Sequence, residues 1–457
     1  MKKQINNEIS TYFVLCLFGI VSLMPVSCKK YLSAKTDKTL VIPSTINDAQ
    51  ALLDFYSAMN ENYPSLGNES DDNYYLKDTY FNSRNVSSQH NYIWSKDAVD
   101  ETDWGYMYQI VLNSNIAIET INSQPDSIRQ SLKAKNIKGA AYFFRALGFY
   151  NVVQYYSKPY NKATAENLPG IPLRLSSDAS LPTKRASLEQ SWQQIISDLK
   201  TAINLLPETN IPITRPSKAA SFAWLANVYL NMGQYDSGEK YADSCLMLNK
   251  TLMDFNTVLK SSTYSFTRFN PEVIFQSVTK YPGSLSYTHY TLDSLLYASY
   301  DSNDLRRKLY FQSNGGGTVG FIGSYDGTAE PFNGIAADEV YLIKAECAAR
   351  NGNQNVAMDY LNKLLVTRWV NGTFIPLAAN SSEEALAIIL KERRKELILR
   401  DRRWFDLRRL NQDEKFAKVL VRIENGIRYT LPPNDNRYTF QIPTNVLSIT
   451  GIEPNIR

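Results

Sequence analysis

The chain has 457 residues, a formal net charge of +4, 44% hydrophobic and 21% charged residues. These values describe an ordinary globular protein with one large domain or two to three smaller ones, and the mild charge does not indicate a polyanionic partner. Aromatic residues reach 12%, led by 30 tyrosines, whose flat apolar face and polar tip suit a binding surface. Packing between helices is the alternative role for each of these rings.

The first 27 residues have the pattern of a secretory signal peptide. Lys2 and Lys3 precede an apolar run over residues 12–23, which is shorter than the roughly 20 residues of a membrane-spanning helix. Ser27 supplies the small residue that signal peptidase II needs before Cys28, whereas Pro25 is a poor match to its preference for leucine. We expect cleavage before Cys28 and lipidation of its thiol, so that residues 28–457 are anchored to a membrane. An ordinary signal peptide with a chance cysteine is the alternative.

Residues 46 to 250 are largely helical in pattern. Apolar residues at helical spacing predict helices at 46–59, 103–121, 127–156 and 187–206, the last one capped by Ser187. Residues 217–248 predict two helices joined at Gly233, and a similar pair surrounds Gly352. Both pairs resemble tetratricopeptide units of about 34 residues, which stack side by side into a solenoid.

Two segments, 60–100 and 250–335, interrupt this pattern. They are polar and aromatic, with short strands predicted at 273–278 and near 321–325. Residues 315–320 satisfy Gly-x-Gly-x-x-Gly, but the pattern predicts no strand before them and no helix after them, so we interpret them as a surface loop. We expect a loop-rich, partly β region over a helical scaffold at about 46–60, 101–250 and 335–411. The tail, 412–457, has strand candidates at 422–430 and 439–442.

Residues 382–410 contain neither glycine nor proline and predict one long helix. Its buried stripe runs through Leu386, Leu390, Leu397 and Trp404. Arg394 and Asp401 fall on the same stripe, so we expect other segments to supply their partners.

Charge is concentrated in the second half of this helix, with nine basic and four acidic residues between positions 391 and 409. One interpretation is a structural helix held by local pairs such as Glu392–Lys395 and Glu396–Arg400. The other is a nucleic-acid-binding face. The interleaved acids favour the structural interpretation, and so does the leader, which is not expected on a cytoplasmic protein.

Residues 392–397 (ERRKEL) and 403–409 (RWFDLRR) resemble the C-terminal signature of the SusD/RagB family of outer-membrane nutrient-binding lipoproteins. The family usually has Glu-Gly where this chain has Arg400-Asp401. Residues 138–146 resemble the family's first conserved helix, and residues 438–443 its C-terminal ending, with Gln441 where proline is usual. The resemblance implies a mainly α fold, a tetratricopeptide-like helix-pair solenoid with a loop-rich, partly β second region, in a single domain over 28–457.

The resemblance also implies a function without catalysis or cofactor. The protein would face the cell exterior at the outer membrane, bind an oligosaccharide or similar nutrient, and deliver it to a SusC-like TonB-dependent transporter. Aromatic faces would stack on sugar rings while polar side chains bind the hydroxyls. The candidate ligand-binding residues in the loop-rich segments are Tyr74, Tyr75, Tyr80, Arg84, Tyr290 and Tyr297.

Motifs of known catalytic chemistry are not found in the sequence. His90 and His289 are the two histidines, and neither belongs to a His-Glu-x-x-His zinc motif. Acidic residues suffice for the carboxylate pair of a glycosidase, although none stands out. An exported glycan-degrading enzyme and a non-binding scaffold subunit of the transporter complex are therefore the alternatives. We expect Cys245 and Cys347 to be buried free thiols, a disulfide between them being the other option.

Overall fold

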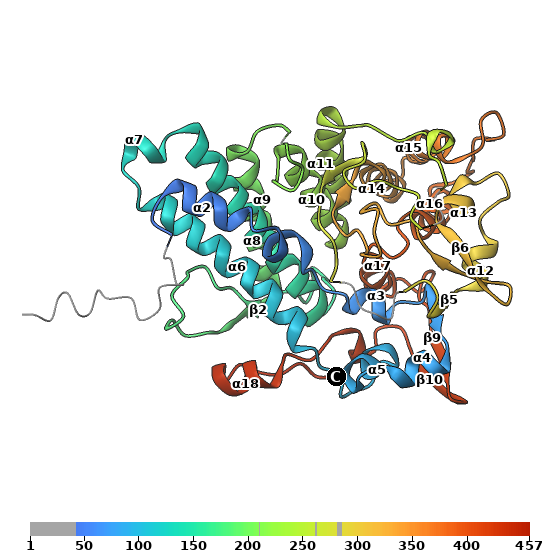
Figure 1. The fold of residues 1–457 in the computed structure, drawn as a ribbon, viewed down its shortest axis with the longest axis horizontal. Helices are drawn as coiled ribbons and strands as arrows, with labels where there is room; N and C mark the ends of the chain where they lie inside the picture. The colour runs from blue at the N-terminus through green and yellow to red at the C-terminus, as the bar shows by residue number, and fades with distance from the viewer. Residues whose placement is uncertain (1–42, 210, 261–262, 281–285) are drawn as a thin grey trace, which may run out of the picture. The chain divides into compact units, whose positions relative to one another are not determined.

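A computed structural model describes residues 43–457 except 210, 261–262 and 281–285 (Figure 1). Residues 44–457 form one compact unit. The predicted signal peptide and Cys28 lie outside the described residues. None of the described helices is both long and apolar enough to cross a membrane.

The scaffold is a series of helices that pack on one another in chain order (Figure 1). α6 packs on α8, α8 on α9, α9 on α10, α10 on α11, and α11 on α14. Their bounds are α2 Ile46–Leu53, α6 Glu101–Asn122, α7 Asp126–Arg129, α8 Leu132–Tyr156, α9 Leu188–Leu205, α10 Lys218–Asn231, α11 Tyr235–Leu248, α14 Ala337–Arg350 and α15 Gln354–Leu365. The prediction of a mainly α, tetratricopeptide-like stack is confirmed.

Glycines shape the two helix pairs. Gly233 and Gly352 have φ of 69° and 83° between their helices, a backbone conformation that glycine adopts without strain. Gly238 on α11 serves a different purpose, because a Cβ there would lie 2.8 Å from the sulfur of Cys347 on α14. The missing side chain thus permits close packing of α11 on α14. Cys245 and Cys347 are buried free thiols, as expected, and burial raises the pKa of Cys245 to about 12.

The remaining elements are short. Between α2 and α6 lie η1 Ser57–Glu61, α3 Leu66–Ser70, β1 Tyr74–Leu76, α4 Asp78–Ser83 and α5 Val86–Tyr92. Residues 60–100, expected to be loop-rich, thus also contain three short helices and one strand. β2 Pro169–Pro172 and β3 Arg185–Ser187 precede α9, and the region between α11 and α14 holds η2 Phe255–Thr257, β4 Val273–Phe275, β5 Tyr290–Leu292, α12 Ser294–Ala298, α13 Leu305–Leu309, β6 Phe311–Gly315, β7 Thr318–Phe321 and β8 Ile335–Ala336.

Among the described residues the strands pair in twos, all antiparallel: β1 with β5, β2 with β3, β4 with β8, β6 with β7, and β9 Leu420–Glu424 with β10 Ile427–Leu431. The predicted strand at 422–430 is thus a hairpin, with Asn425 and Gly426 at its turn. Gly315, Gly316 and Gly317 have positive φ where β6 turns into β7, so they form the hairpin turn, and residues 318–320 belong to β7. The expectation that no strand precedes this segment is wrong, because β6 ends at Gly315. Short elements η4 Val366–Arg368, η5 Asn436–Tyr438 and α18 Thr444–Thr450 complete the chain.

Two apolar clusters correspond to the two predicted regions. The larger one is built mainly from the helices of the scaffold. The smaller one is rich in aromatic rings and comes mainly from residues 74–92 and 255–336, with Ile398 and Leu399 added from the C-terminal part. The loop-rich segments therefore share a core of their own, distant in sequence from each other but joined by β1 and β5.

The prediction of one helix over 382–410 is wrong. The chain forms α16 Ser382–Glu396 and α17 Arg403–Leu410, with a turn between them in which Leu399 and Asp401 have φ of 53° and 60°. Partners from other elements hold this turn: the Arg400 guanidinium lies 2.7 Å from Asp338, and the Asp401 N–H donates to Asn68. These tertiary contacts outweigh the helical preference of the local sequence.

Buried ion pairs surround α16 and α17. The Arg394 guanidinium lies 3.1 Å from Asp293 and 3.4 Å from Asp72, which confirms that other segments supply its partners. The local pair Glu392–Lys395 forms at 3.0 Å. The prediction of a Glu396–Arg400 pair is wrong, because Glu396 instead binds two arginines from other segments of the chain. Most basic side chains of α16, α17 and the turn between them are buried or paired with acids, so these residues do not form the continuous exposed basic surface of a nucleic-acid-binding face.

Candidate binding site in the loop-rich region

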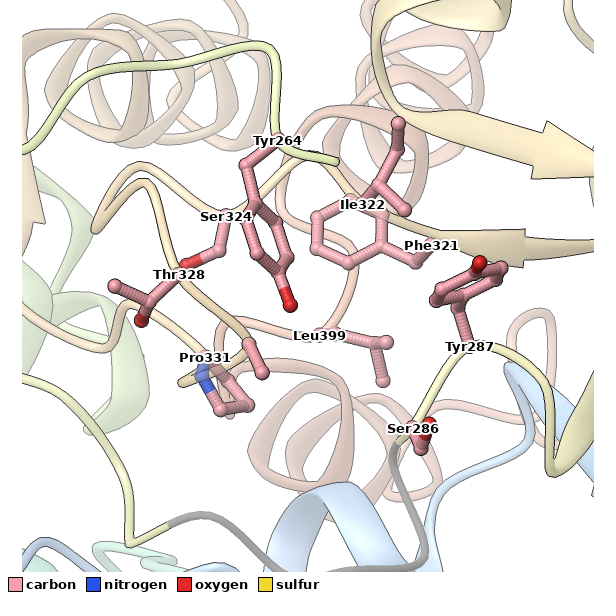
Figure 2. Close-up of a pocket in the computed structure, with 10 residues that line it drawn as sticks. Tyr264, Ser286, Tyr287, Phe321, Ile322, Ser324, Thr328, Pro331 and Leu399 are labelled. Atoms are coloured by element: carbon pink, nitrogen blue, oxygen red, sulfur yellow. The ribbon is translucent and has the colours of Figure 1, made fainter. Parts of the chain in front are cut away.

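An aromatic pocket of about 90 Å³ lies in the loop-rich region (Figure 2). We call it the aromatic pocket. Its walls come from the segment around Tyr264, from residues 286–287, from residues 321–331 and from the turn after α16. It is lined by Tyr264, Ser286, Tyr287, Phe321, Ile322, Ser324, Thr328, Ala329, Pro331 and Leu399. None of these side chains is charged.

Strand β7 brings one wall into contact with the segment before β5. A Cβ built at Gly320 would lie 2.2 Å from the carbonyl oxygen of Tyr287, so only glycine permits this approach. The next residue, Phe321, donates its N–H to the Tyr290 hydroxyl at 3.0 Å. These contacts fix the Tyr287 and Phe321 side chains on neighbouring segments, where Figure 2 shows them on the same side of the pocket.

Leu399, in the turn between α16 and α17, reaches the centre of the same space (Figure 2). It is held there by its neighbour Arg400, which pairs with Asp338 and whose guanidinium carbon lies 3.9 Å from the centroid of the Tyr325 ring. A guanidinium over an aromatic face is a favourable contact in a desolvated site. The break in the predicted helix therefore has a structural consequence: it supplies part of the pocket.

Hydroxyl groups provide the polar part of the lining. The Ser324 hydroxyl donates to the Glu330 carbonyl at 2.6 Å, and the Thr328 hydroxyl donates to Asp326 at 2.7 Å. Ser286 and Thr288 share a hydroxyl–hydroxyl contact of 3.3 Å. The Ser324 hydroxyl also accepts from the N–H groups of Asp326 and Phe332, so its two lone pairs are occupied, whereas the Thr328 hydroxyl accepts only from the Glu330 N–H and keeps one lone pair for a ligand.

A second hollow, of about 270 Å³, lies on the neighbouring segments. It is lined by Leu76, Tyr80, Ser83, Arg84, Asn85, Ser88 and His289. The Tyr80 ring stacks on His289 with centroids 4.0 Å apart, and Arg84 is paired with Glu69 at 2.7 Å. Ser286 and Tyr287 line the aromatic pocket and His289 lines the second hollow, so one short stretch of chain borders both.

The structure places the six sequence-derived candidates in different surroundings. Tyr80 and Arg84 share the second hollow. Tyr74 and Tyr290 are both 0% exposed, with ring centroids 4.9 Å apart, so they support the site from within. Tyr75, on the opposite face of β1, is 41% exposed. Tyr297 packs edge-on against Phe311 and under Arg307.

None of the six candidates lines the aromatic pocket. Tyr264, Tyr287 and Phe321 do, and the sequence analysis did not single them out. The available signal was the aromatic content of 250–335, where rings within a loop-rich stretch stand close to serine, threonine and glycine. Across the described part of the chain, no group of three or more His, Cys, Asp or Glu side chains is placed to hold a metal ion.

Two family models match the sequence. A model described as starch-binding and associating with the outer membrane matches residues 30–230, and the SusD family model matches residues 293–448. A SusD-like protein of Formosa agariphila is 23% identical over 371 residues, covering 67% of this chain and 71% of the relative. A second SusD-like protein of that organism is 22% identical and covers 90% of this chain and 92% of its own.

Solved structures share the fold. A SusD superfamily protein from Bacteroides thetaiotaomicron superposes with a TM-score of 0.73 at 20% identity, covering 90% of this chain and all of the other. A putative sugar-binding protein from Bacteroides vulgatus has a TM-score of 0.72 at 18% identity, covering 91% and 99%. At these identities the likeness concerns the fold alone.

Proposed function

We propose that this chain, which belongs to the SusD/RagB family, binds an oligosaccharide or similar nutrient across the aromatic pocket and the second hollow, of about 90 and 270 Å³, without cleaving it. The observation that carries this proposal is the lining of the pocket. Aromatic rings and fixed hydroxyls from distant segments meet there, and charged side chains do not line it. A neutral sugar ring has matching surfaces, with apolar C–H faces and a rim of hydroxyls.

Binding would rest on ring stacking and hydrogen bonding together. The rings of Tyr264, Tyr287 and Phe321 offer apolar surface, while the Thr328 hydroxyl offers an acceptor at a fixed position. Small-molecule sites commonly combine an apolar lining with a few placed polar groups. A longer ligand would continue past residues 286–289 into the second hollow, where Tyr80 and Arg84 would meet its next unit.

Binding is supported over hydrolysis by the absence of acids from the lining. Glycosidases of the usual kinds place two carboxyl groups about 5–9.5 Å apart across the scissile bond. No Asp or Glu side chain lines the aromatic pocket. We therefore propose a binding protein.

We further propose that it is lipid-anchored at the outer membrane through Cys28, faces the exterior, and delivers its ligand to a SusC-like TonB-dependent transporter. The outer-membrane association in the name of one matching family model supports the location.

Calorimetry with the purified protein against a panel of neutral plant and host oligosaccharides tests the proposal. We expect at least one saccharide to bind and Tyr287→Ala to weaken it about tenfold or more, as loss of a buried aromatic contact does. Tyr360→Ala on α15, a partly buried tyrosine that does not line the pocket, is the matched control and should leave affinity unchanged.

The same titration separates the alternatives. Release of shorter sugars during incubation would identify a glycan-degrading enzyme instead. Failure of every saccharide to bind, together with co-purification of an intact transporter, would identify the non-binding scaffold.

A further inference from the structure

A separate cavity of about 330 Å³ lies at the C-terminal end of α17. We call it the Arg408 cavity. Its walls come from the segment after α8, from the end of α17 and from residues 434–439. It is lined by Lys158, Pro159, Asn161, Thr164, Leu168, Arg408, Asn411, Gln412, Asn434, Asp435, Tyr438 and Thr439. It shares no lining residue with the aromatic pocket or the second hollow.

Arg408 differs from the other buried arginines of α16, α17 and the turn between them. Each of the others has a carboxylate within 4 Å: Arg393 with Asp406, Arg400 with Asp338, Arg402 with Glu339, Arg409 with Glu346, and the partly buried Arg394 and Arg403 with Asp72. Arg408 is 2% exposed and forms no ion pair with any carboxylate in the described part of the chain. This region thus neutralises its buried cations with one exception.

The guanidinium of Arg408 is also incompletely hydrogen-bonded. Its Nη2 donates to the carbonyl of Ser157, while Nε and Nη1 have no acceptor among the described residues. An arginine has five N–H donors, and a buried charge without partners is strongly unfavourable. A group of this kind calls for an explanation, and a missing anionic partner is the simplest one.

The other charges around the cavity do not supply that partner. Lys158 adds a second cation, and its Nζ donates to the neutral Asn436 side chain. Asp435 is the one acid in the lining, but both of its oxygens accept from Arg437, at 2.9 Å each. The cavity therefore has two cations without a carboxylate of their own.

We propose that the Arg408 cavity binds a small oxyanion, either a carboxylate or a sulfate group, on a ligand about the size of one sugar ring. Guanidinium groups bind planar and tetrahedral oxyanions with strong, directed hydrogen bonds. The cavity volume lies at the lower end of the range for small-molecule sites, about 300–1,000 Å³, which suits a single ring better than a chain. Of the amides in the lining, the Nδ2 of Asn411 has no acceptor among the described residues, whereas Asn161 and Gln412 are hydrogen-bonded to each other.

Titration of the full protein with glucuronate, glucose and inorganic sulfate at low ionic strength tests this site. We expect glucuronate to bind and to raise the thermal unfolding midpoint, while glucose, which has the same ring without the charge, does neither. Arg408→Met should abolish the response to glucuronate, with at least a tenfold loss of affinity. The variant should fold, because it replaces an unpaired buried charge by an apolar side chain of similar length.

Two further variants keep the test decisive. Lys158→Ala should weaken glucuronate binding without removing Arg408, which covers the case that Arg408→Met fails to fold. Tyr287→Ala should leave the affinity for glucuronate unchanged, because the aromatic pocket shares no lining residue with the Arg408 cavity. If inorganic sulfate binds in an Arg408-dependent manner and glucuronate does not bind, the oxyanion chemistry is supported and the ligand of the cavity is a free ion. Equal binding of glucose and glucuronate, unchanged affinity in both cavity variants, or no binding of either anion would overturn the proposal.

Discussion

Glu396 lies between Arg306 and Arg368, at 2.8 Å from each, and all three side chains are 0% exposed. Arg306 also binds Asp304 and Glu392, and Arg368 binds Glu272. With Glu396, these acids come from three separate parts of the sequence: residue 272, residue 304 and helix α16. Single residues of α16 thus connect the helical scaffold to the loop-rich region. The sequence showed that charges fall on the buried stripe, but it could not show their partners, because those depend on which distant segments meet in the fold.

Glu396→Gln removes the shared acid while keeping the shape of the side chain. We expect a loss of about 3–5 kcal/mol in the free energy of unfolding, since two buried arginines each lose a partner. The measurement is the midpoint of denaturant unfolding. Glu383→Gln is the matched control: Glu383 pairs with Lys415 on the surface, where solvent screens the charges, so its loss should leave the unfolding midpoint nearly unchanged. Similar effects of the two substitutions would contradict this account of the buried network.

Asp401 stands where the family usually has glycine, and its backbone explains that usage. Its φ of 60° lies in the left-handed region, which glycine adopts freely and aspartate tolerates better than most residues. The side chain offsets part of the strain by accepting a hydrogen bond from the Tyr155 hydroxyl. Burial raises the pKa of this carboxyl to about 7. Gly67 leaves room for it, since a Cβ there would lie 2.3 Å from an Asp401 oxygen.

Two substitutions at this position separate backbone strain from side-chain contacts. Asp401→Ala and Asp401→Gly both remove the carboxylate, but only glycine relieves the left-handed conformation. We expect the glycine variant to be more stable than the alanine variant by about 1 kcal/mol. Thermal unfolding of the two proteins measures the difference. An alanine variant at least as stable as the glycine variant would show that the turn relaxes out of the left-handed region.

At the scale of elements, the sequence predicts the features that local signals determine and misses those that tertiary contacts determine. The helix pairs around Gly233 and Gly352 could be predicted because periodicity, small residues and glycine turns all act within some 30 residues. The break between α16 and α17 could not. Its sequence, ILRDRR, contains good helix formers, and only contacts with Asn68, Tyr155 and Asp338 select the turn. The same turn brings Leu399 into the aromatic pocket.

The most specific prediction for the binding site at the scale of elements concerns Gly320 on β7. A Cβ at this position would require the segment at Tyr287 to move, because 2.2 Å is far shorter than any allowed carbon–oxygen contact. We expect Gly320→Ala to weaken saccharide binding about tenfold or more, measured by calorimetry, as Tyr287 leaves its position.

A matched control for Gly320 lies on α6. Apart from its chain neighbours and the backbone of its own helix, no atom lies within 4 Å of the Cβ that Gly105→Ala would add there. Alanine in a helix interior should raise stability by about 0.5–1 kcal/mol and leave binding unchanged. Normal saccharide affinity in Gly320→Ala would mean that the pocket does not depend on the close approach of β7 to Tyr287.

For the molecule as a whole, the sequence indicated the regions of the site better than its residues. The loop-rich segments 60–100 and 250–335 do share an aromatic core, and the aromatic pocket lies mostly within the second. Which rings are accessible depends on strand register. β1 pairs with β5 so that Tyr74 lies inside and Tyr75 outside, although the two residues are adjacent and identical in type. Sequence composition cannot distinguish them without that pairing.

The proposed anchor makes a prediction about the whole protein that is independent of the pocket. In cells fed labelled palmitate, we expect the wild-type protein to carry label in the membrane fraction and Cys28→Ala to lack it, because the thiol of Cys28 is the proposed acylation site. Cys245→Ala is the matched control, since Cys245 is buried in the scaffold and its loss should leave labelling intact. The purified Cys28→Ala protein should bind saccharide as the wild type does, because the pocket is formed by residues 264–399. Persistent labelling of Cys28→Ala would place the acyl chain elsewhere and remove Cys28 as the anchor.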